Sequence, residues 1–467
     1  MRTVLIAAAV FAMAGCASLS NDARFSSVEQ AVKERTGAET KWTRSDDDAT
    51  TVGMRVKELL AKPLGPTEAV QIALLNNPGL QASYAEVGVA EADLVQASRW
   101  RGPTFSYARL RRGGVETEIE RGVFFDVLGL LTIPLSTRAS ESRLQAAQQR
   151  AAGEALRVAL DTRKAWFHAV AAQETARYMA QVKESAATSA ELARRMAEVG
   201  NFPKLTHARE QAFYAETTAQ LARARHNATA TRERLARLTG LWGEQLSFEL
   251  PDRLPELPKS IREGGDLEAQ AIAQRLDVQG ARRDAESLAR TLGLTKVTRF
   301  VNLLEVGILS KSQTDKDTQR GWEVEVGLPI FDFGGARVAR AERLYMQAAN
   351  RTIEAAVDAR SEVRETYSAY RTAFDLAKHY RDEIVPLRKR ISEEVLLRYN
   401  GMLISVFELL ADSREQVTAV NAAIETLRDF WLAESDLQMA LTGRSPGAAA
   451  PLSRGGAPGA AVPMGGH

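Results

Sequence analysis

The sequence is poor in the residues that build disulfides and metal centres. It holds a single cysteine, Cys16, and five scattered histidines. One cysteine excludes an intramolecular disulfide, and no histidines stand at the short spacing of a zinc site. We therefore expect neither a metal site nor a cysteine-rich cofactor site.

The chain also lacks an excess of charge and a high apolar content. Its 61 Lys and Arg residues nearly balance 59 Asp and Glu residues, and the net charge of +2 gives no argument for nucleic acid as a partner. A mean hydropathy of −0.24 is too polar for a bundle of membrane-spanning helices. Aromatic residues make up only 6%, while Ala, Arg, Glu, Gln and Leu dominate long stretches, which favours long helices or coiled coils.

The first sixteen residues have the pattern of an export signal. Arg2 supplies a positive charge, residues 4–12 form an apolar run, and small residues precede Cys16. The run is too short for a stable membrane-spanning helix, which needs about 20 residues. Residues 13–16 (Met-Ala-Gly-Cys) resemble a bacterial lipobox, in which the cysteine becomes the lipid-bearing N-terminus. An ordinary signal peptide is the alternative, and the position of the only cysteine favours lipidation.

Glycine and proline divide the rest of the chain into two similar halves. Residues 209–211 and 414–416 both read Arg-Glu-Gln, and 238–240 and 441–443 both read Leu-Thr-Gly. The repeat is far too long for a solenoid, so it indicates a two-fold pseudo-repeat of helix, hairpin, long helix and helix.

These breaks predict the following organisation. We expect a lipoprotein signal peptide over 1–15, a lipid-anchored extension over 16–65, a first repeat over 66–243, a linker over 244–265, a second repeat over 266–443 and a disordered tail over 444–467. The first repeat has a helix over 67–98, a β-hairpin over 99–135, a long helix over 136–199 and a helix over 204–238. The second has a helix over 266–292, a hairpin over 296–330, a long helix over 336–399 and a helix over 405–441. Residues 46–48, three aspartates, are expected to be a solvated loop.

The last strand and the second long helix show clear periodicities. Residues 322–328 alternate apolar with polar or small side chains, as in a membrane β-barrel strand or in a half-buried soluble strand. In the helix, apolar positions from Val363 to Ile391 are spaced alternately three and four apart, which predicts coiled-coil packing. Pro386 lies within this seam and should cost a hydrogen bond or a kink. At about 1.5 Å per residue, the helix reaches roughly 96 Å, which suits a tube or a stalk.

Two hairpins supply only four strands. The smallest bacterial membrane barrels have about eight strands, and open strand edges cannot lie in lipid. If the hairpins are membrane strands, the barrel must be shared between several chains.

The chain resembles the outer membrane efflux protein family, the TolC-like channels, and especially its lipoprotein branch. The resemblance rests on residues 64–74 (Leu-Gly-Pro-Thr-Glu-Ala-Val-Gln-Ile-Ala-Leu), on 76–78 (Asn-Asn-Pro), on 327–335 (Gly-Leu-Pro-Ile-Phe-Asp-Phe-Gly-Gly) and on the duplication. It implies a mostly α fold with membrane β-strands. Three chains would form a homotrimer with a twelve-stranded outer-membrane barrel continued by a periplasmic α-helical barrel. The partners implied are a periplasmic adaptor and an inner-membrane pump, which supplies the energy for a passive channel.

The resemblance also assigns candidate functional residues. The helix–helix turns far from the membrane would form the entrance and the adaptor contact, and they match Gly200, Asn201, Phe202, Gly401, Met402 and Leu403. Exposed apolar side chains there suit a partner-binding surface, while ordinary turn packing is the alternative. Glu408 is the nearest match to the acidic residues that narrow the entrance in some members. No basic partner stands at the second turn, since Met402 and Leu403 occupy it.

Two other classes of protein are weighed against the channel. A periplasmic adaptor lipoprotein would carry one central helical hairpin between Gly-rich β-domains, whereas this chain has two long hairpins and little β-sequence. An enzyme is disfavoured because no nucleophile elbow, phosphate loop, metal cluster or paired-carboxylate motif is present. The transported substrate stays open among metal ions, drugs and other small molecules.

Overall fold

The computed structural model describes residues 19–20, 22, 24–113, 116–200, 203–262, 264–301 and 303–447. The chain forms two units, each assembled from separate segments. Of the described residues, one unit comprises those up to Val28 together with Ala82–Ala152 and Leu276–Val357, and the other comprises Glu29–Gln81, Gly153–Arg275 and those from Asp358 onward. The predicted signal peptide, Cys16, Asn201, Phe202 and most of the predicted tail lie outside the described residues.

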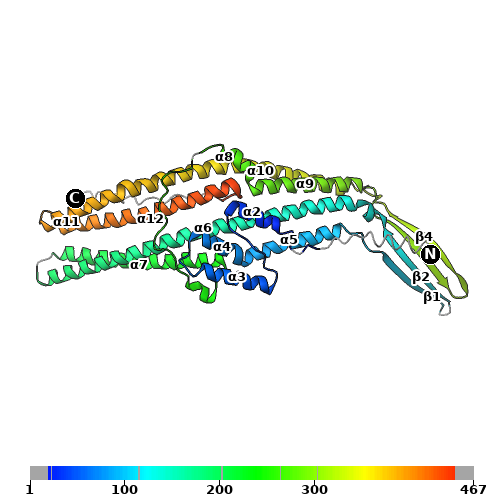
Figure 1. Ribbon diagram of the computed structural model, residues 1–467, viewed down its shortest axis with the longest axis horizontal. Coiled ribbons are helices and arrows are strands. Elements are labelled where there is room, and N and C mark those ends of the chain that lie inside the picture. The colour runs from blue at the N-terminus through cyan, green and yellow to red at the C-terminus, as the bar shows by residue number, and fades with distance from the viewer. Residues whose placement is uncertain are drawn as a thin grey trace, which may run out of the picture. The chain divides into compact units, whose positions relative to one another are not determined.

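The order of elements repeats along the chain (Figure 1). The first half contains α4 (Pro66–Asn76), α5 (Pro78–Ala97), β1 (Thr104–Arg112), β2 (Glu116–Asp126), α6 (Val127–Glu198) and α7 (Lys204–Thr239). The second half contains α8 (Leu267–Gln274), α9 (Leu276–Val297), β3 (Leu303–Gln313), β4 (Lys316–Gly327), α10 (Gly335–His379), a π-helical turn (Tyr380–Ile384), α11 (Val385–Asn400) and α12 (Val406–Thr442). The expected mostly helical fold with a duplicated helix–hairpin–helix–helix order is confirmed.

The N-terminal extension is more ordered than expected. It forms α2 (Ser26–Thr36) and α3 (Asp46–Leu59), so the prediction of a loop at 46–48 is wrong. Ser45 caps α3 by accepting a hydrogen bond from the Asp48 N–H (3.2 Å), and the aspartates occupy the first turn, where the helix dipole favours negative charge. Lys41 adds an ion pair to Asp48 (2.8 Å).

The predicted linker over 244–265 is also not a free connection. It begins with a 3₁₀ turn, η1 (Gly243–Ser247), and then buries Phe248, Leu250 and Leu254 in a hydrophobic cluster with Trp166 and Ile72. The indole N–H of Trp166 donates to the Leu64 carbonyl (2.6 Å), which ties α6 to the segment before α4. Proline-rich sequence here therefore specifies an irregular path over a core.

The first hairpin ends earlier than the predicted range of 99–135. Strand β2 stops at Asp126 and α6 starts at Val127, so Gly129 and Pro134 lie inside the helix. The Asp126 carboxylate accepts a hydrogen bond from the Gly129 N–H (2.6 Å), which is an N-cap interaction. Because the apolar run continues across this cap, its hydrophobicity alone gave no sign of the change from strand to helix.

Three predicted helices are interrupted. The helix expected over 67–98 breaks at Asn77, and the helix over 266–292 breaks at Arg275, whose buried guanidinium pairs with Glu362 (2.7 Å). The long helix over 336–399 contains the π-helical turn directly before Pro386. There the Val385 N–H bonds to the Tyr380 carbonyl, so the register shifts by one residue where proline cannot donate.

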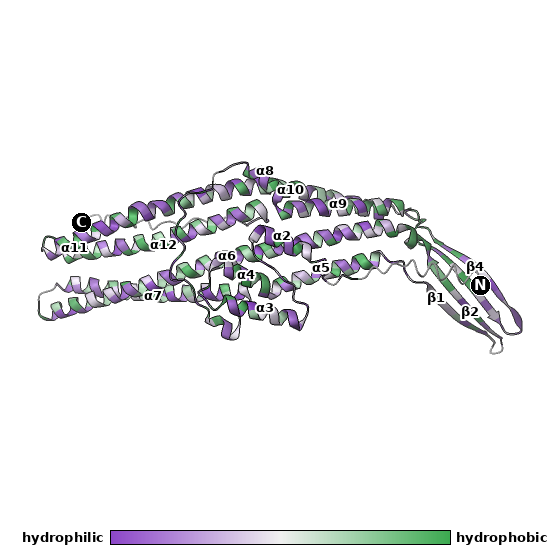
Figure 2. Ribbon diagram, viewed as in Figure 1, coloured by the Kyte–Doolittle hydropathy of each residue, from purple (hydrophilic) through white to green (hydrophobic). Residues whose placement is uncertain are grey.

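The coiled-coil seam is buried up to this turn and becomes exposed after it. Val363, Tyr370 and Ala377 are buried, and Tyr370 and Phe374 pack on Phe430 of α12. No described helix is both long enough and apolar enough to cross a membrane. The helices instead carry apolar and polar residues in stripes, as Figure 2 shows.

Candidate functional site

Within the described residues, the strands form one antiparallel sheet with the order β1-β2-β3-β4. Its register places side chains in rows across all four strands. One such row joins Phe105, Val123, Ile308 and Trp322, and the next row toward the helices joins Phe125, Val306 and Val324. Both rows lie on the same face of the sheet, because they stand two residues apart on each strand.

This apolar face is exposed. Phe105 is 74% exposed, Ile308 66% and Trp322 77%, and the pattern continues through Val324 and Val326. Aromatic and β-branched side chains on a solvent-facing sheet are unfavourable in water, and they are the pattern of a lipid-facing strand surface. The alternation expected over 322–328 is thus the alternation of an uncovered face, and the soluble half-buried alternative is not seen within the described part of this chain.

The opposite face of the sheet is more polar, although it also carries Leu110, Leu303 and Leu309. It carries Lys311 with ion pairs to Glu118 and Glu120, together with Glu305, Glu323 and Glu325. Phe124 is the aromatic exception, and it lies over Gly307, its register partner, and over Gly122. Phe124 thus interrupts the alternation of the first hairpin, whereas the apolar residues Leu130 and Leu131 belong to α6.

Strands β1 and β4 each have one unpaired edge in the described sheet. Exposed edges present free backbone N–H and C=O groups, which cannot remain unpaired in lipid. Four strands in an open sheet do not close on themselves, so this surface is incomplete without further strands.

At the two helix–helix turns, a different kind of residue takes the left-handed backbone conformation. Gly200 takes the left-handed conformation (φ +78°) after α6, whereas after α11 it is Met402 that does so (φ +58°). The Leu403 N–H bonds to the Arg398 carbonyl (2.9 Å) and the Met402 N–H to the Tyr399 carbonyl (2.9 Å), which is a Schellman motif. Gly401, which precedes Met402, has φ −80°.

Both turns carry exposed apolar side chains. Met402 is 93% exposed and Leu403 77%, and Val199 and Leu205 flank the first turn at 71% and 61%. Both turns lie at the same end of their unit in Figure 1. A non-glycine residue held at positive φ with its side chain in solvent is a strained arrangement that points to a function.

Glu408 lies in the first turn of α12 and lines a groove between α11 and α12. The groove has a volume of about 430 Å³, and its walls include Leu387, Ile391, Arg390 and Arg398. The groove also contains Glu394, which pairs with Arg398 (2.9 Å), so its walls carry charges of both signs.

Sequence reasoning missed a buried carboxyl near these turns. Glu210 on α7 is 2% exposed, and neither of its carboxyl oxygens has a hydrogen-bond partner among the described residues. Burial raises the pKa of Glu210, and Arg414 on α12 opposes that rise. The repeated Arg-Glu-Gln triplet at 209–211 was the available signal, but the triplet does not distinguish a buried glutamate from an exposed one.

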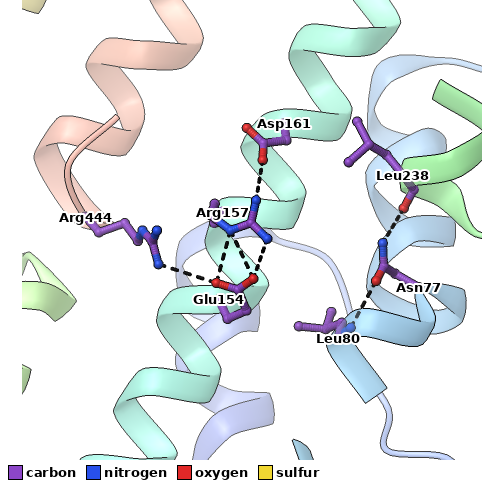
Figure 3. Close-up of polar contacts among 7 residues, drawn as sticks. All are labelled: Asn77, Leu80, Glu154, Arg157, Asp161, Leu238 and Arg444. Carbon is purple, nitrogen blue, oxygen red and sulfur yellow. Dashed lines mark hydrogen bonds and ion pairs between the residues drawn. The ribbon is translucent and has the colours of Figure 1, made fainter. Parts of the chain in front are cut away.

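The Asn-Asn-Pro motif at 76–78 has a structural role (Figure 3). The Asn77 side chain donates to the Leu238 carbonyl (2.8 Å) and accepts from the Leu80 N–H (2.9 Å), so it caps α5 and holds the end of α7. Asn76 donates to the Gly240 carbonyl (2.9 Å). The motif thus joins both ends of the first repeat.

Figure 3 also shows a charged chain on α6. Arg157 bridges Glu154 and Asp161, and Arg444 approaches Glu154 (3.4 Å) from beyond α12. The hydrogen bond from Arg157 is the main cause that lowers the pKa of Glu154. In the described residues, no group of His, Cys, Asp and Glu side chains could hold a metal ion.

No family model and no curated protein matches the chain. Solved structures do match it. The outer membrane channel CmeC of Campylobacter jejuni gives a TM-score of 0.68 at 18% identity over 88% of this chain and 90% of that one. The outer membrane protein VceC of Vibrio cholerae gives 0.64 at 16% over 85% and 97%. The open state of the Neisseria gonorrhoeae MtrE outer membrane channel gives 0.60 at 16% over 80% and 88%.

Proposed function

We propose that this chain, which has the fold of TolC-like outer-membrane channels, is the exit duct of a tripartite efflux system. It would be a passive, non-enzymatic channel in the outer membrane that extends into the periplasm. The observation that carries the proposal is the open four-stranded sheet, with one exposed apolar face and two unpaired edges. Contact with lipid would explain why the apolar face is exposed, and pairing with copies of the same chain would satisfy the unpaired strand edges.

The assembly that satisfies both edges is a closed ring of copies. In a homotrimer, the β1 edge of one copy pairs with the β4 edge of the next, and three four-stranded sheets make a twelve-stranded barrel. The polar face with Glu118, Glu120 and Lys311 then lines the pore. The long helices α6, α7, α10, α11 and α12 would continue the duct as an α-helical barrel.

The trimer can be tested by disulfide cross-linking in the Cys16→Ala background. Ser106→Cys on β1 is combined in turn with Gln319→Cys, Gly321→Cys or Glu323→Cys on β4, all on the polar face. We expect at least one combination to yield a covalent three-chain species on oxidation in membranes. The single-cysteine variants are matched controls, since each can form dimers at most. Monomers from all three combinations would contradict the shared barrel.

Lipidation at Cys16 is a further part of the proposal. The lipobox-like residues 13–16 support it, and we expect Cys16→Ala to abolish metabolic labelling with palmitate. Labelling that continues without Cys16 would remove the anchor from the proposal.

The turns would form the periplasmic entrance and the adaptor-binding tips. Gly200, Asn201 and Phe202 make up one tip, and residues 401–403 make up the other, with Glu408 beside the entrance. Exposed Met402 and Leu403 support this assignment. We expect Leu403→Glu to reduce adaptor pull-down and export at normal membrane levels, with Leu192→Glu, an exposed leucine on α6, as the control. Equal binding by both variants would count against the tips.

The adaptor alternative has less support. An adaptor would have one helical hairpin, whereas this chain pairs two long hairpins with membrane-type strands. The pump and adaptor partners follow from the channel proposal, and the substrate stays open among metal ions, drugs and other small molecules.

A further inference from the structure

Four arginines interrupt the apolar face of the sheet near its hairpin turns. Arg109 and Arg111 on β1 share the face of Phe105 and Tyr107, and Arg121 on β2 stands in register with Tyr107. Arg320 on β4 completes that row through Ser310. We call Arg109, Arg111, Arg121 and Arg320 the arginine collar.

The collar begins where the apolar rows end. Arg121 and Arg320 stand two residues beyond Val123 and Trp322, which is about 7 Å along a strand toward the turns. Arg109 and Arg111 continue for a further two and four residues from Tyr107. The aromatic residues Tyr107 and Trp322 border the collar, as aromatic side chains do at a membrane–water boundary.

All four collar arginines are exposed, and no guanidinium group among them makes a hydrogen bond or ion pair with the described part of the chain. The opposite face differs, because its Lys311 is paired with Glu118 and Glu120. Glu305, Glu323 and Glu325 also lie on the polar face, and no carboxylate of the described residues pairs with a collar arginine. Four positive charges per chain are left for a ligand outside the protein.

This inference rests on the proposed function, which places the apolar face in the outer membrane with the hairpin turns outward. At that depth the outer leaflet presents the phosphates of its glycolipid. Guanidinium groups bind phosphate through paired, charge-assisted hydrogen bonds. We propose that the arginine collar binds the phosphate groups of the phosphorylated glycolipid of the outer leaflet.

Closure of the barrel strengthens the collar. Arg109 and Arg111 lie on the β1 edge and Arg320 on the β4 edge, so neighbouring copies bring these residues to adjacent strands. Each seam between copies would then have arginines from both sides. One bisphosphorylated headgroup could contact arginines of two chains.

The test measures glycolipid binding to the purified full-length oligomer by native mass spectrometry. The probes are bisphosphorylated lipid A and the same glycolipid after removal of its phosphates. Near an anionic surface each arginine contributes about fivefold to binding, so Arg121→Gln/Arg320→Gln should bind bisphosphorylated lipid A about 25-fold more weakly. The matched control is Arg223→Gln/Arg225→Gln on α7, which removes two exposed arginines outside the sheet and should bind as the unaltered protein does.

The possible outcomes distinguish a failure of the glycolipid-binding inference from a failure of the proposed channel function. Stronger binding of the phosphorylated probe, lost with the collar and with added salt, supports the inference. Equal binding of both probes by an unaltered, membrane-inserted oligomer refutes it, because the arginines then merely extend into water. If the collar variant fails to assemble, the comparison of the two probes on the unaltered protein still decides. A protein that never inserts refutes the channel, and the inference with it.

Discussion

Gly307 in β3 is the position where the sheet should be least tolerant of an added methyl group. A Cβ built there would lie 2.7 Å from Cε1 and 3.0 Å from Cγ of Phe124, well inside van der Waals contact. Phe124 is paired with Gly307 in the register, and its ring also lies 2.7 Å from a Cβ built at Gly122, so the ring has to leave its position to admit the methyl group. Overpacking of this kind costs about 1–3 kcal/mol. We expect Gly307→Ala to lower the stability of the sheet by that amount.

Gly321→Ala is the matched control. Gly321 lies on the same polar face in β4, and a Cβ added there would meet no heavy atom of the described chain within 4 Å. Alanine in a strand is more favourable than glycine by roughly 0.5–1 kcal/mol, so this variant should be neutral or stabilised. The assay is the thermal dissociation of the detergent-extracted oligomer. In a Phe124→Ala background, Gly307→Ala should behave like Gly321→Ala. Equal stabilities of Gly307→Ala and Gly321→Ala with Phe124 present would refute the reasoning.

Two further predictions concern the helices. Met402→Gly removes the strain of a left-handed non-glycine residue and should raise the free energy of unfolding by about 1 kcal/mol, whereas Met402→Ala keeps that strain. Chemical denaturation measures both variants, and a larger gain in stability from alanine than from glycine would contradict the turn geometry. His168 on α6 has its pKa lowered to about 4 by burial and by nearby Arg428 and Arg234. The unfolded chain therefore binds a proton near pH 6.5, whereas the folded chain binds it only near pH 4. The free energy of unfolding should fall by about 3 kcal/mol as the pH drops through that window, and it should level off below it. His168→Gln should flatten this part of a denaturation-against-pH profile, and an unchanged slope would count against the burial of the ring.

The periodicity of apolar residues and the positions of glycine and proline predicted most of the architecture. The duplication, the four strands and the long helices follow from glycine and proline spacing and from alternation, because these patterns record which faces are buried or exposed. The exact boundaries between strands and helices were harder to predict from the sequence. The apolar stretch after Val123 spans a strand and a helix, and the change depends on a single cap at Asp126 that hydrophobicity does not reveal.

The candidate site was predicted unevenly for a similar reason. The exposed apolar tip at Met402 and Leu403 could be placed because it follows a helix break. The left-handed residue could not be placed from the sequence, because only the backbone geometry and the Schellman hydrogen bonds identify Met402. Burial of Glu210 depends on helix pairing between distant segments, and the arginine collar depends on strand register. Both are relations between residues far apart in the sequence.

The unpaired edges of β1 and β4 have a consequence for biogenesis. In the proposed shared barrel, one copy cannot complete the sheet alone, so final folding and association with other copies become a single concentration-dependent event. At low concentration, chains would remain longer with unpaired strand edges, which promote aggregation. Dilute expression should therefore lower the yield of mature protein more steeply than in proportion to synthesis, and periplasmic holdase chaperones should matter most when copies are few.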